Sequence, residues 1–103
     1  MSINKIDLER SLNPIIKNVN AILNRAHVYM ANFDISNKEE YKKDEVLVSE
    51  MHMEMAKLLS YVNELNDIAM KAMTINDKDI YFKCEDSKAK IVDVMEHLRN
   101  LYM

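Results

Sequence analysis

The fold is decided by residues 36–73, which read SNKEEYKKDEVLVSEMHMEMAKLLSYVNELNDIAMKAM. Ser36 followed three residues later by Glu39 is a capping box, in which both side chains accept hydrogen bonds from backbone amides at a helix start. Apolar residues then recur at alternating steps of three and four, the spacing of a helix packed along its length against other helices. This row consists of Val48, Met51, Met55, Leu58, Val62, Leu65, Ala69 and Ala72. We therefore predict a long helix over residues 37–73, whose first turns (38–45) are polar except for Tyr41.

A helix over residues 4–32 is predicted to precede it, with the same alternating steps. Its apolar row consists of Leu8, Leu12, Ile15, Val19, Ile22, Ala26, Tyr29 and Phe33. Pro14 lies inside this row, where it removes one backbone amide and its ring crowds the carbonyl four residues earlier. Because the apolar phase continues through Pro14, the pattern favours a kink at this residue. The alternative is a short fourth helix that ends near Ser11, after which the chain restarts with Asn13 as N-cap and Pro14 as the first helical residue.

A third helix is predicted over residues 77–102. Its start is ambiguous, because residues 79–85 contain the β-branched and aromatic content of a strand. A lone strand would have no partner in this chain, however, and one helical row accounts for the whole segment. That row consists of Ile80, Cys84, Ser87, Ile91, Val94, Leu98 and Leu101. Short connections place consecutive helices side by side. We therefore predict an all-α antiparallel three-helix bundle, a single helical domain spanning residues 1–103.

Composition excludes several functional classes. The 103-residue chain contains no glycine, so it cannot form a Walker loop, a glycine-rich dinucleotide turn or a Gly-x-Ser-x-Gly elbow. Its formal net charge of −3 argues against nucleic-acid binding. It has neither an apolar run of about 18 residues nor the apolar core of a signal peptide, so we expect no membrane contact. A cytoplasmic location is expected, with export by a leaderless route as the alternative. Cys84, the single cysteine, is expected to be a buried thiol.

The charges are unevenly divided between the first two predicted helices. Residues 3–32 carry four bases and two acids, whereas residues 38–73 carry five bases and eight acids. The first helix is therefore mildly positive and the second is negative. We interpret this difference as complementary rims on two neighbouring helices.

Candidate catalytic and metal-binding groups are sparse. His52 does not lie on the helix face shared by Glu50 and Glu54, since alternate residues of a helix point about 200° apart. Asp93 and His97 are four residues apart and would supply only half of a two-helix metal site. The Glu64-x-x-Asp67 pair has no second carboxylate pair facing it, which a helical carboxylate site requires. We therefore predict no catalytic residue, no metal site, no cofactor and no enzymatic activity.

The remaining signal is a surplus of flexible and aromatic apolar residues. The chain has nine methionines, residues that fill irregular cores and also line surfaces that accept partner helices. Tyr81 and Phe82 are adjacent, so a helix directs only one of them into the core and the other toward the rim. Partner contact is predicted at Tyr41, Met51, Met55, Tyr81 and Phe82.

These features favour a non-enzymatic protein-interaction module, such as a small adaptor, a chaperone-like secretion partner or a phage-type inhibitor. It would bury an apolar Met/aromatic helix face against a protein partner. Homodimerisation is also expected, because the helix over 37–73 is longer than its neighbours. The alternative is a small helical bundle that binds a nucleotide or a divalent metal, with its site completed across a dimer by carboxylates and histidines.

Overall fold

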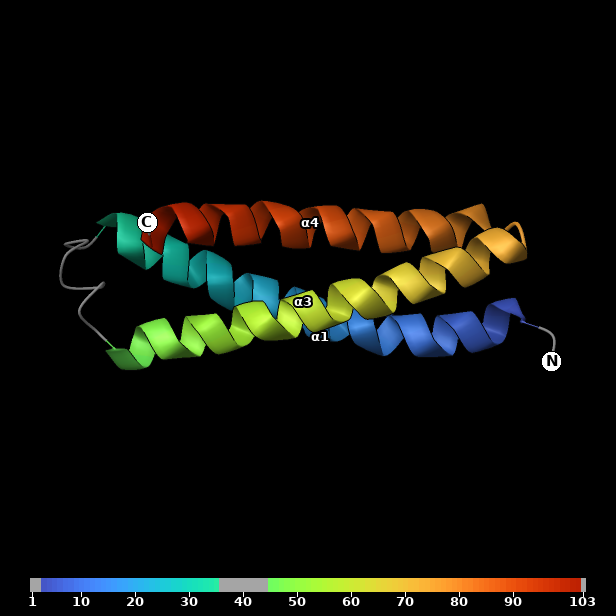
Figure 1. The fold of residues 1–103 in the computed structure, drawn as a ribbon, viewed down its shortest axis with the longest axis horizontal. Helices are drawn as coiled ribbons and strands as arrows, with labels where there is room; N and C mark the ends of the chain where they lie inside the picture. The colour runs from blue at the N-terminus through green and yellow to red at the C-terminus, as the bar shows by residue number, and fades with distance from the viewer. Residues whose placement is uncertain (1–2, 36–44, 103) are drawn as a thin grey trace.

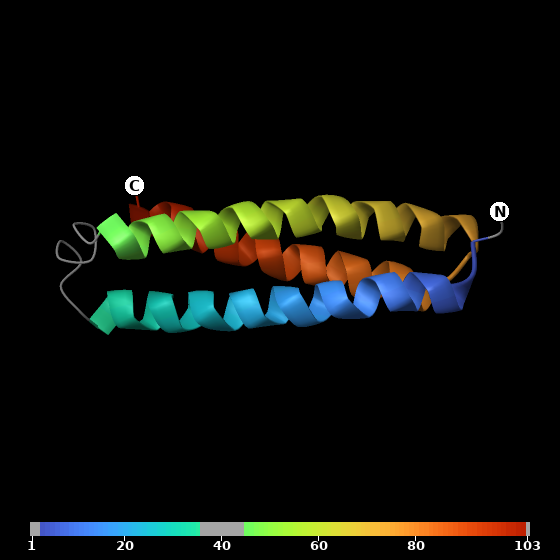
Figure 2. The ribbon, with the colours of Figure 1, turned by 90° about the horizontal axis from the view of Figure 1, so that it is seen from below.

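Three helices form from the three predicted rows: α1 (Lys5–Ile35), α3 (Glu45–Thr74) and α4 (Lys78–Tyr102). This computed structural model describes residues 3–35 and 45–102. Helix α3 runs antiparallel to both α1 and α4, so the chain passes up, down and up again (Figures 1 and 2). Each helix packs against the other two, and the bundle measures 53 × 19 × 18 Å. The prediction of an all-α three-helix bundle is confirmed.

The core consists of the residues that the three/four spacing selected. Within the described chain, Leu12, Leu58 and Ile91 are among the largest side chains that are completely buried, one from each helix. Ile15, Met55 and Val62 lie at the edge of the core as partly buried residues. Ser87 is the buried polar member of the α4 row, and every buried side-chain nitrogen or oxygen in the described residues has a hydrogen-bond partner. Removal of apolar surface from water therefore holds the three helices together.

Helix α1 continues through Pro14 from Lys5 to Ile35. Of the two predicted alternatives at this position, the structure therefore rules out a separate short N-terminal helix. Helix α1 begins with reciprocal capping: the Asn4 side-chain oxygen accepts a 2.9 Å hydrogen bond from the Asp7 amide, and Asn4 Nδ2 donates to Asp7 Oδ2, also at 2.9 Å. This cap satisfies one of the amides that every helix start leaves unpaired.

The connection between α3 and α4 is a tight turn that needs a left-handed residue. Asn76 takes this conformation, with φ of 56°. Its amide donates to the Met73 carbonyl at 3.1 Å, and the Asp77 amide donates to the Ala72 carbonyl at 2.9 Å. These two bonds define a Schellman motif, in which asparagine occupies the position usually held by glycine. Asparagine suits this position in a chain without glycine, because it tolerates positive φ better than most other residues.

Asp77 also starts the next helix. Its side-chain Oδ1 accepts a 3.1 Å hydrogen bond from the Ile80 amide, which is the N-cap interaction of α4. Helix α4 then includes residues 79–85, so the helical interpretation of that segment is confirmed. The same carboxylate lies 3.8 Å from the Lys5 ammonium, which places the start of α1 beside this turn.

The predicted rims of α1 and α3 meet at an ion pair. Arg25 of α1 contacts both carboxylate oxygens of Glu54 of α3, at 3.2 and 3.1 Å. Such a two-pronged pair sets the relative position of two helices more firmly than a single contact does. The predicted polar start of the second helix, with its capping box at Ser36, lies outside the described residues.

Candidate interaction surface

Over positions 50–71 of α3, the charged residues gather on one side of the helix. Glu54 contacts α1, while Glu64, Asp67 and Lys71 line a groove between α1 and α3. Glu50 and Lys57 belong to the same side, since positions 50, 54, 57, 64 and 71 fall on one row of three- and four-residue steps or its seven-residue multiples. The other flank of α3, which borders α4, therefore carries no formal charge over the described turns of positions 59–73.

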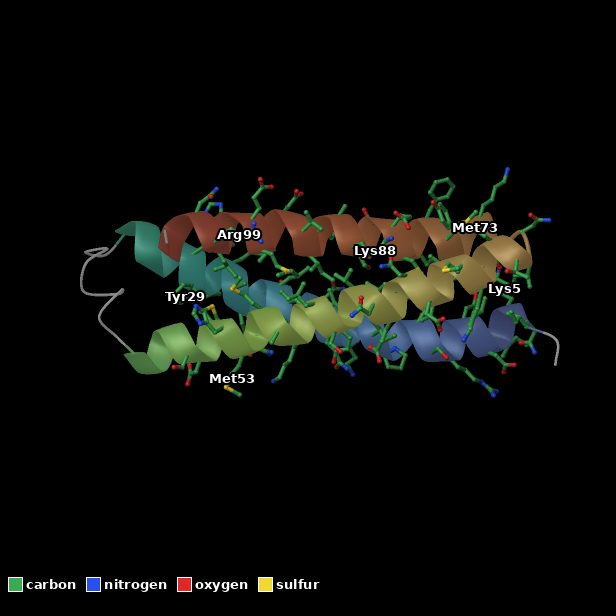
Figure 3. The ribbon with its side chains drawn as sticks, in the orientation of Figure 1. Lys5, Tyr29, Met53, Met73, Lys88 and Arg99 are labelled. Atoms are coloured by element: carbon green, nitrogen blue, oxygen red, sulfur yellow. The ribbon has the colours of Figure 1, made fainter. Side chains whose placement is uncertain are left out.

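That uncharged flank exposes large apolar side chains. Leu59 is 54% exposed, Met70 69% and Met73 62%. They belong to a second row of alternating steps that also contains Asn63 and Asn66. Met73 lies beside α4, whereas Met53 projects from the opposite side of α3 (Figure 3). Helix α3 thus has two rows without charge: one apolar row is buried in the core, and the second row is exposed at the surface.

Helix α4 presents a matching outer row. It runs Lys78, Phe82, Glu85, Ala89, Val92, Glu96 and Arg99. Phe82 is 62% exposed and Val92 is 54% exposed. We call the surface formed by these two rows the α3–α4 face, and define its apolar members as Leu59, Met70, Met73, Phe82 and Val92.

Three open hollows follow the line where α3 and α4 meet. The hollow nearest the turn has a volume of about 420 Å³ and is bordered by Met73, Lys78 and Phe82. The middle hollow has about 480 Å³ and the outermost about 340 Å³, and both are bordered by Val92. Together the hollows form a discontinuous groove along the α3–α4 face, with apolar side chains at each level.

A polar bridge crosses the middle of this face. The Lys88 ammonium donates to Asn66 Oδ1 of α3 at 2.6 Å and forms a 2.7 Å ion pair with Glu85. Lys88 lies between α3 and α4 (Figure 3). The bridge neutralises Glu85 and places Asn66 at the level of Lys88. Lys78 and Glu96, near the two ends of the α4 row, have no ion-pair partner within the described chain.

The predicted contact residues fall in different environments. Met51 is buried, Met55 and Tyr81 are partly buried against the core, and Phe82 is exposed. The rings of Tyr81 and Phe82 meet edge to face, with centroids 5.7 Å apart. Tyr41 lies outside the described residues. The structure thus brings Tyr81 and Phe82 together beside the turn and places Met51 in the core.

Sequence reasoning missed the other apolar members of the α3–α4 face, Leu59, Met70, Met73 and Val92. A signal for three of them was available. Positions 59, 63, 66, 70 and 73 form an uncharged row with the same steps as the core row. An exposed helix surface normally carries charges, so the lack of charge along a second row marks an unusual surface.

Among the described residues, the side chains with potential chemistry lie in different surroundings. Burial raises the pKa of the Cys84 thiol from 9.0 to about 11; the neighbouring Glu85 adds to this increase and Lys88 opposes it. A thiol with a raised pKa is a poor nucleophile at neutral pH. His27, Asp93 and His97 border one groove between α1 and α4. Across residues 3–35 and 45–102, however, no three His, Cys, Asp or Glu side chains are grouped to hold a metal ion.

None of the described helices is both long and apolar enough to cross a membrane. Comparison with protein-family models, with curated proteins and with solved structures finds no match for this chain. The function must therefore be argued from the surface itself.

Proposed function

We propose that this protein is a non-enzymatic interaction module whose α3–α4 face receives a helix of a protein partner. The observation that carries the proposal is the row of exposed apolar residues on both sides of one groove, with the charges of α3 placed elsewhere. A helix laid along this groove would complete a four-helix arrangement, in which each helix contacts two neighbours. The recognition mode would be that of an amphipathic helix in an apolar groove.

The other two grooves of the bundle are less suited to a helix partner. The α1–α3 groove is lined by Glu64, Asp67 and Lys71, of which the last two form a 3.0 Å ion pair. The α1–α4 groove is lined by His27, Asp93 and His97. Covering either groove would remove charged or titratable groups from water, which costs free energy unless each finds a partner. The α3–α4 face also borders charged residues, but it exposes five large apolar side chains, whereas none of the residues that line the other two grooves is an exposed large apolar residue.

The apolar members set the scale of the binding energy. Each is more than half exposed, so covering it would contribute about 1 to 2 kcal/mol of the roughly 1.5–3 kcal/mol for complete burial of such a side chain. Five residues contribute roughly 5–10 kcal/mol, against an association cost of about 4–15 kcal/mol. Apolar burial is therefore of the same size as the association cost, and polar contacts at the rim decide which helix binds.

The test uses a displayed library of amphipathic 20-residue helices as the probe. Clones selected on the wild-type protein should lose binding to a Met70→Glu variant and to a Val92→Glu variant. They should retain binding to Met53→Glu, since Met53 is a similarly exposed methionine on the opposite side of α3. Clones that bind all three variants equally would contradict the proposal, because their site would lie elsewhere.

The alternative, a bundle that binds a nucleotide or divalent metal, is tested by thermal unfolding. An interaction module without a nucleotide or metal site should gain no stability from these ligands. The midpoint should stay unchanged with 5 mM Mg²⁺, Mn²⁺ or Zn²⁺ and with 1 mM ATP, about a thousand-fold above a micromolar dissociation constant. A clear upward shift with any of them would replace the interaction proposal by the ligand-binding alternative.

A further inference from the structure

We propose that the occupant of the α3–α4 face is the same face of a second copy of this chain, related by a two-fold axis perpendicular to the helices. This inference rests on the proposed function and names its partner. Dimers of identical chains use one surface patch on both subunits, so that patch must be complementary to itself. The positions of apolar and charged residues on the α3–α4 face meet this condition in one arrangement.

The middle of the face provides the reference level. Because Lys88 donates to Asn66 at 2.6 Å, Asn66 of α3 and the Ser87–Lys88 level of α4 lie at the same height along the bundle. A two-fold axis that passes through this height, in the plane of the contact, places α3 over α3 and α4 over α4 with their directions reversed. Residues at equal distances above and below the reference level then meet across the contact.

Four of the five apolar residues of this face are symmetric about this level, and Met70 is the exception. On α4, Phe82 and Val92 lie five residues before and five residues after Ser87. On α3, Leu59 and Met73 lie seven residues before and seven residues after Asn66. The reversed arrangement therefore sets Phe82 against the partner's Val92 and Met73 against the partner's Leu59. Each contact occurs twice, and all four residues are more than half exposed in the single chain.

Two charges of the α4 row are symmetric about the same level and opposite in sign, whereas Arg99 at the end of the row has no counterpart. Lys78 and Glu96 lie nine residues before and nine residues after Ser87. The reversed arrangement brings Lys78 of one copy to the partner's Glu96, and the second such pair forms at the other end. Glu85 brings no unpaired charge to the centre, because Lys88 already neutralises it at 2.7 Å.

A parallel dimer does not give this pairing. It would place α4 of each copy over the second row of α3 of the other, which has no formal charge over positions 59–73. That row offers no charged partner to Lys78 or Glu96, whereas the antiparallel arrangement sets the two opposite charges against each other. The position of these two charges therefore selects the antiparallel arrangement, as rim charges commonly fix register and orientation.

Charge reversal with the intact chain tests the arrangement. Sedimentation equilibrium should give the wild type twice the 12.1 kDa chain mass. Lys78→Glu and Glu96→Lys should each raise the dissociation constant by about ten-fold or more, because either change creates two like-charge contacts. The double variant Lys78→Glu/Glu96→Lys should return it to within about three-fold of wild type, since both pairs are restored with reversed sign. Circular dichroism verifies that each variant is folded.

Lys83→Glu is the matched control. Lys83 lies on α4, five residues from Lys78, is exposed and belongs to neither outer row. This variant changes the net charge by the same amount as Lys78→Glu, and it should leave the dissociation constant within about two-fold of wild type.

Each contrary result has a separate meaning. A wild type that remains monomeric at several hundred micromolar overturns the dimer. If that monomer still binds library helices through Met70 and Val92, the proposed function stands; if it binds none, both proposals fail. A dimer that responds equally to Lys78→Glu and Lys83→Glu, or that the double variant does not restore, overturns the antiparallel register.

Discussion

Leu58 and Leu59 are adjacent leucines on α3, and truncating each to alanine should have very different effects. Leu58 is completely buried, whereas Leu59 is 54% exposed on the α3–α4 face. Leu58→Ala removes three buried carbons, worth about 0.8 kcal/mol each, or roughly 2.4 kcal/mol. The cavity left in the core adds to this loss, so we expect about 3–4 kcal/mol in total. Leu59→Ala leaves no cavity and should cost about 1 kcal/mol.

Urea unfolding followed by circular dichroism at 222 nm measures both values. A domain of this size has a free energy of unfolding of roughly 5–15 kcal/mol, so Leu58→Ala should shift the midpoint strongly without unfolding the chain in water. Because Leu59 belongs to the proposed dimer contact, the free energy of unfolding that Leu59→Ala loses should grow with protein concentration. At every concentration, Leu58→Ala should lose more than Leu59→Ala. Equal losses for the two variants at low concentration would refute the assignment of the core row on α3.

Three further changes probe the turn, the proline and the thiol. Asn76→Val should lower the free energy of unfolding by about 1–2 kcal/mol in urea titrations, because a β-branched residue resists positive φ. Asn76→Gly should not lower the free energy of unfolding, and similar losses for the two variants would contradict the Schellman turn. Pro14→Ala should raise the thermal midpoint, because it restores a backbone amide inside the helix, where proline costs up to about 3 kcal/mol relative to alanine. A lower midpoint would contradict a continuous α1. Cys84 has a pKa raised from 9.0 to about 11, so the folded state favours the neutral thiol: its contribution is complete below pH 9 and is lost as pH rises toward 11. Wild type should therefore lose stability relative to Cys84→Ala over this interval, and parallel pH curves for the two proteins would contradict a buried thiol.

Periodicity in the sequence was sufficient for the helices and the core. The rows through Leu12, Leu58 and Ile91 were predicted from spacing alone, and the structure buries all three residues. The segment around Tyr81 was correctly interpreted as helix despite its strand-like composition. Its helical start is explained by the Asp77 cap and by the core positions of Ile80 and Cys84, which outweigh local preference.

The surface was harder to predict, for a geometric reason. Spacing identifies which residues of a helix share a row, but it does not reveal which neighbour lies on each flank. A third helix can pack on either side of the first two with the same apolar pattern, so the flank of α3 that contains Met70 could face either neighbour. Spacing alone therefore favours Met51 and Met55 as contact residues, whereas the structure places them in or against the core.

The turn at Asn76 and Asp77 also affects the order in which the chain folds. Only residues 75–77 separate α3 from α4, so closing this hairpin costs little conformational entropy compared with bringing distant segments together. Its two capping interactions are local and can form before any contact with α1. We expect α3 and α4 to pair first and α1 to add to the preformed hairpin, which makes α1 the helix whose amides exchange with solvent most readily in the native state.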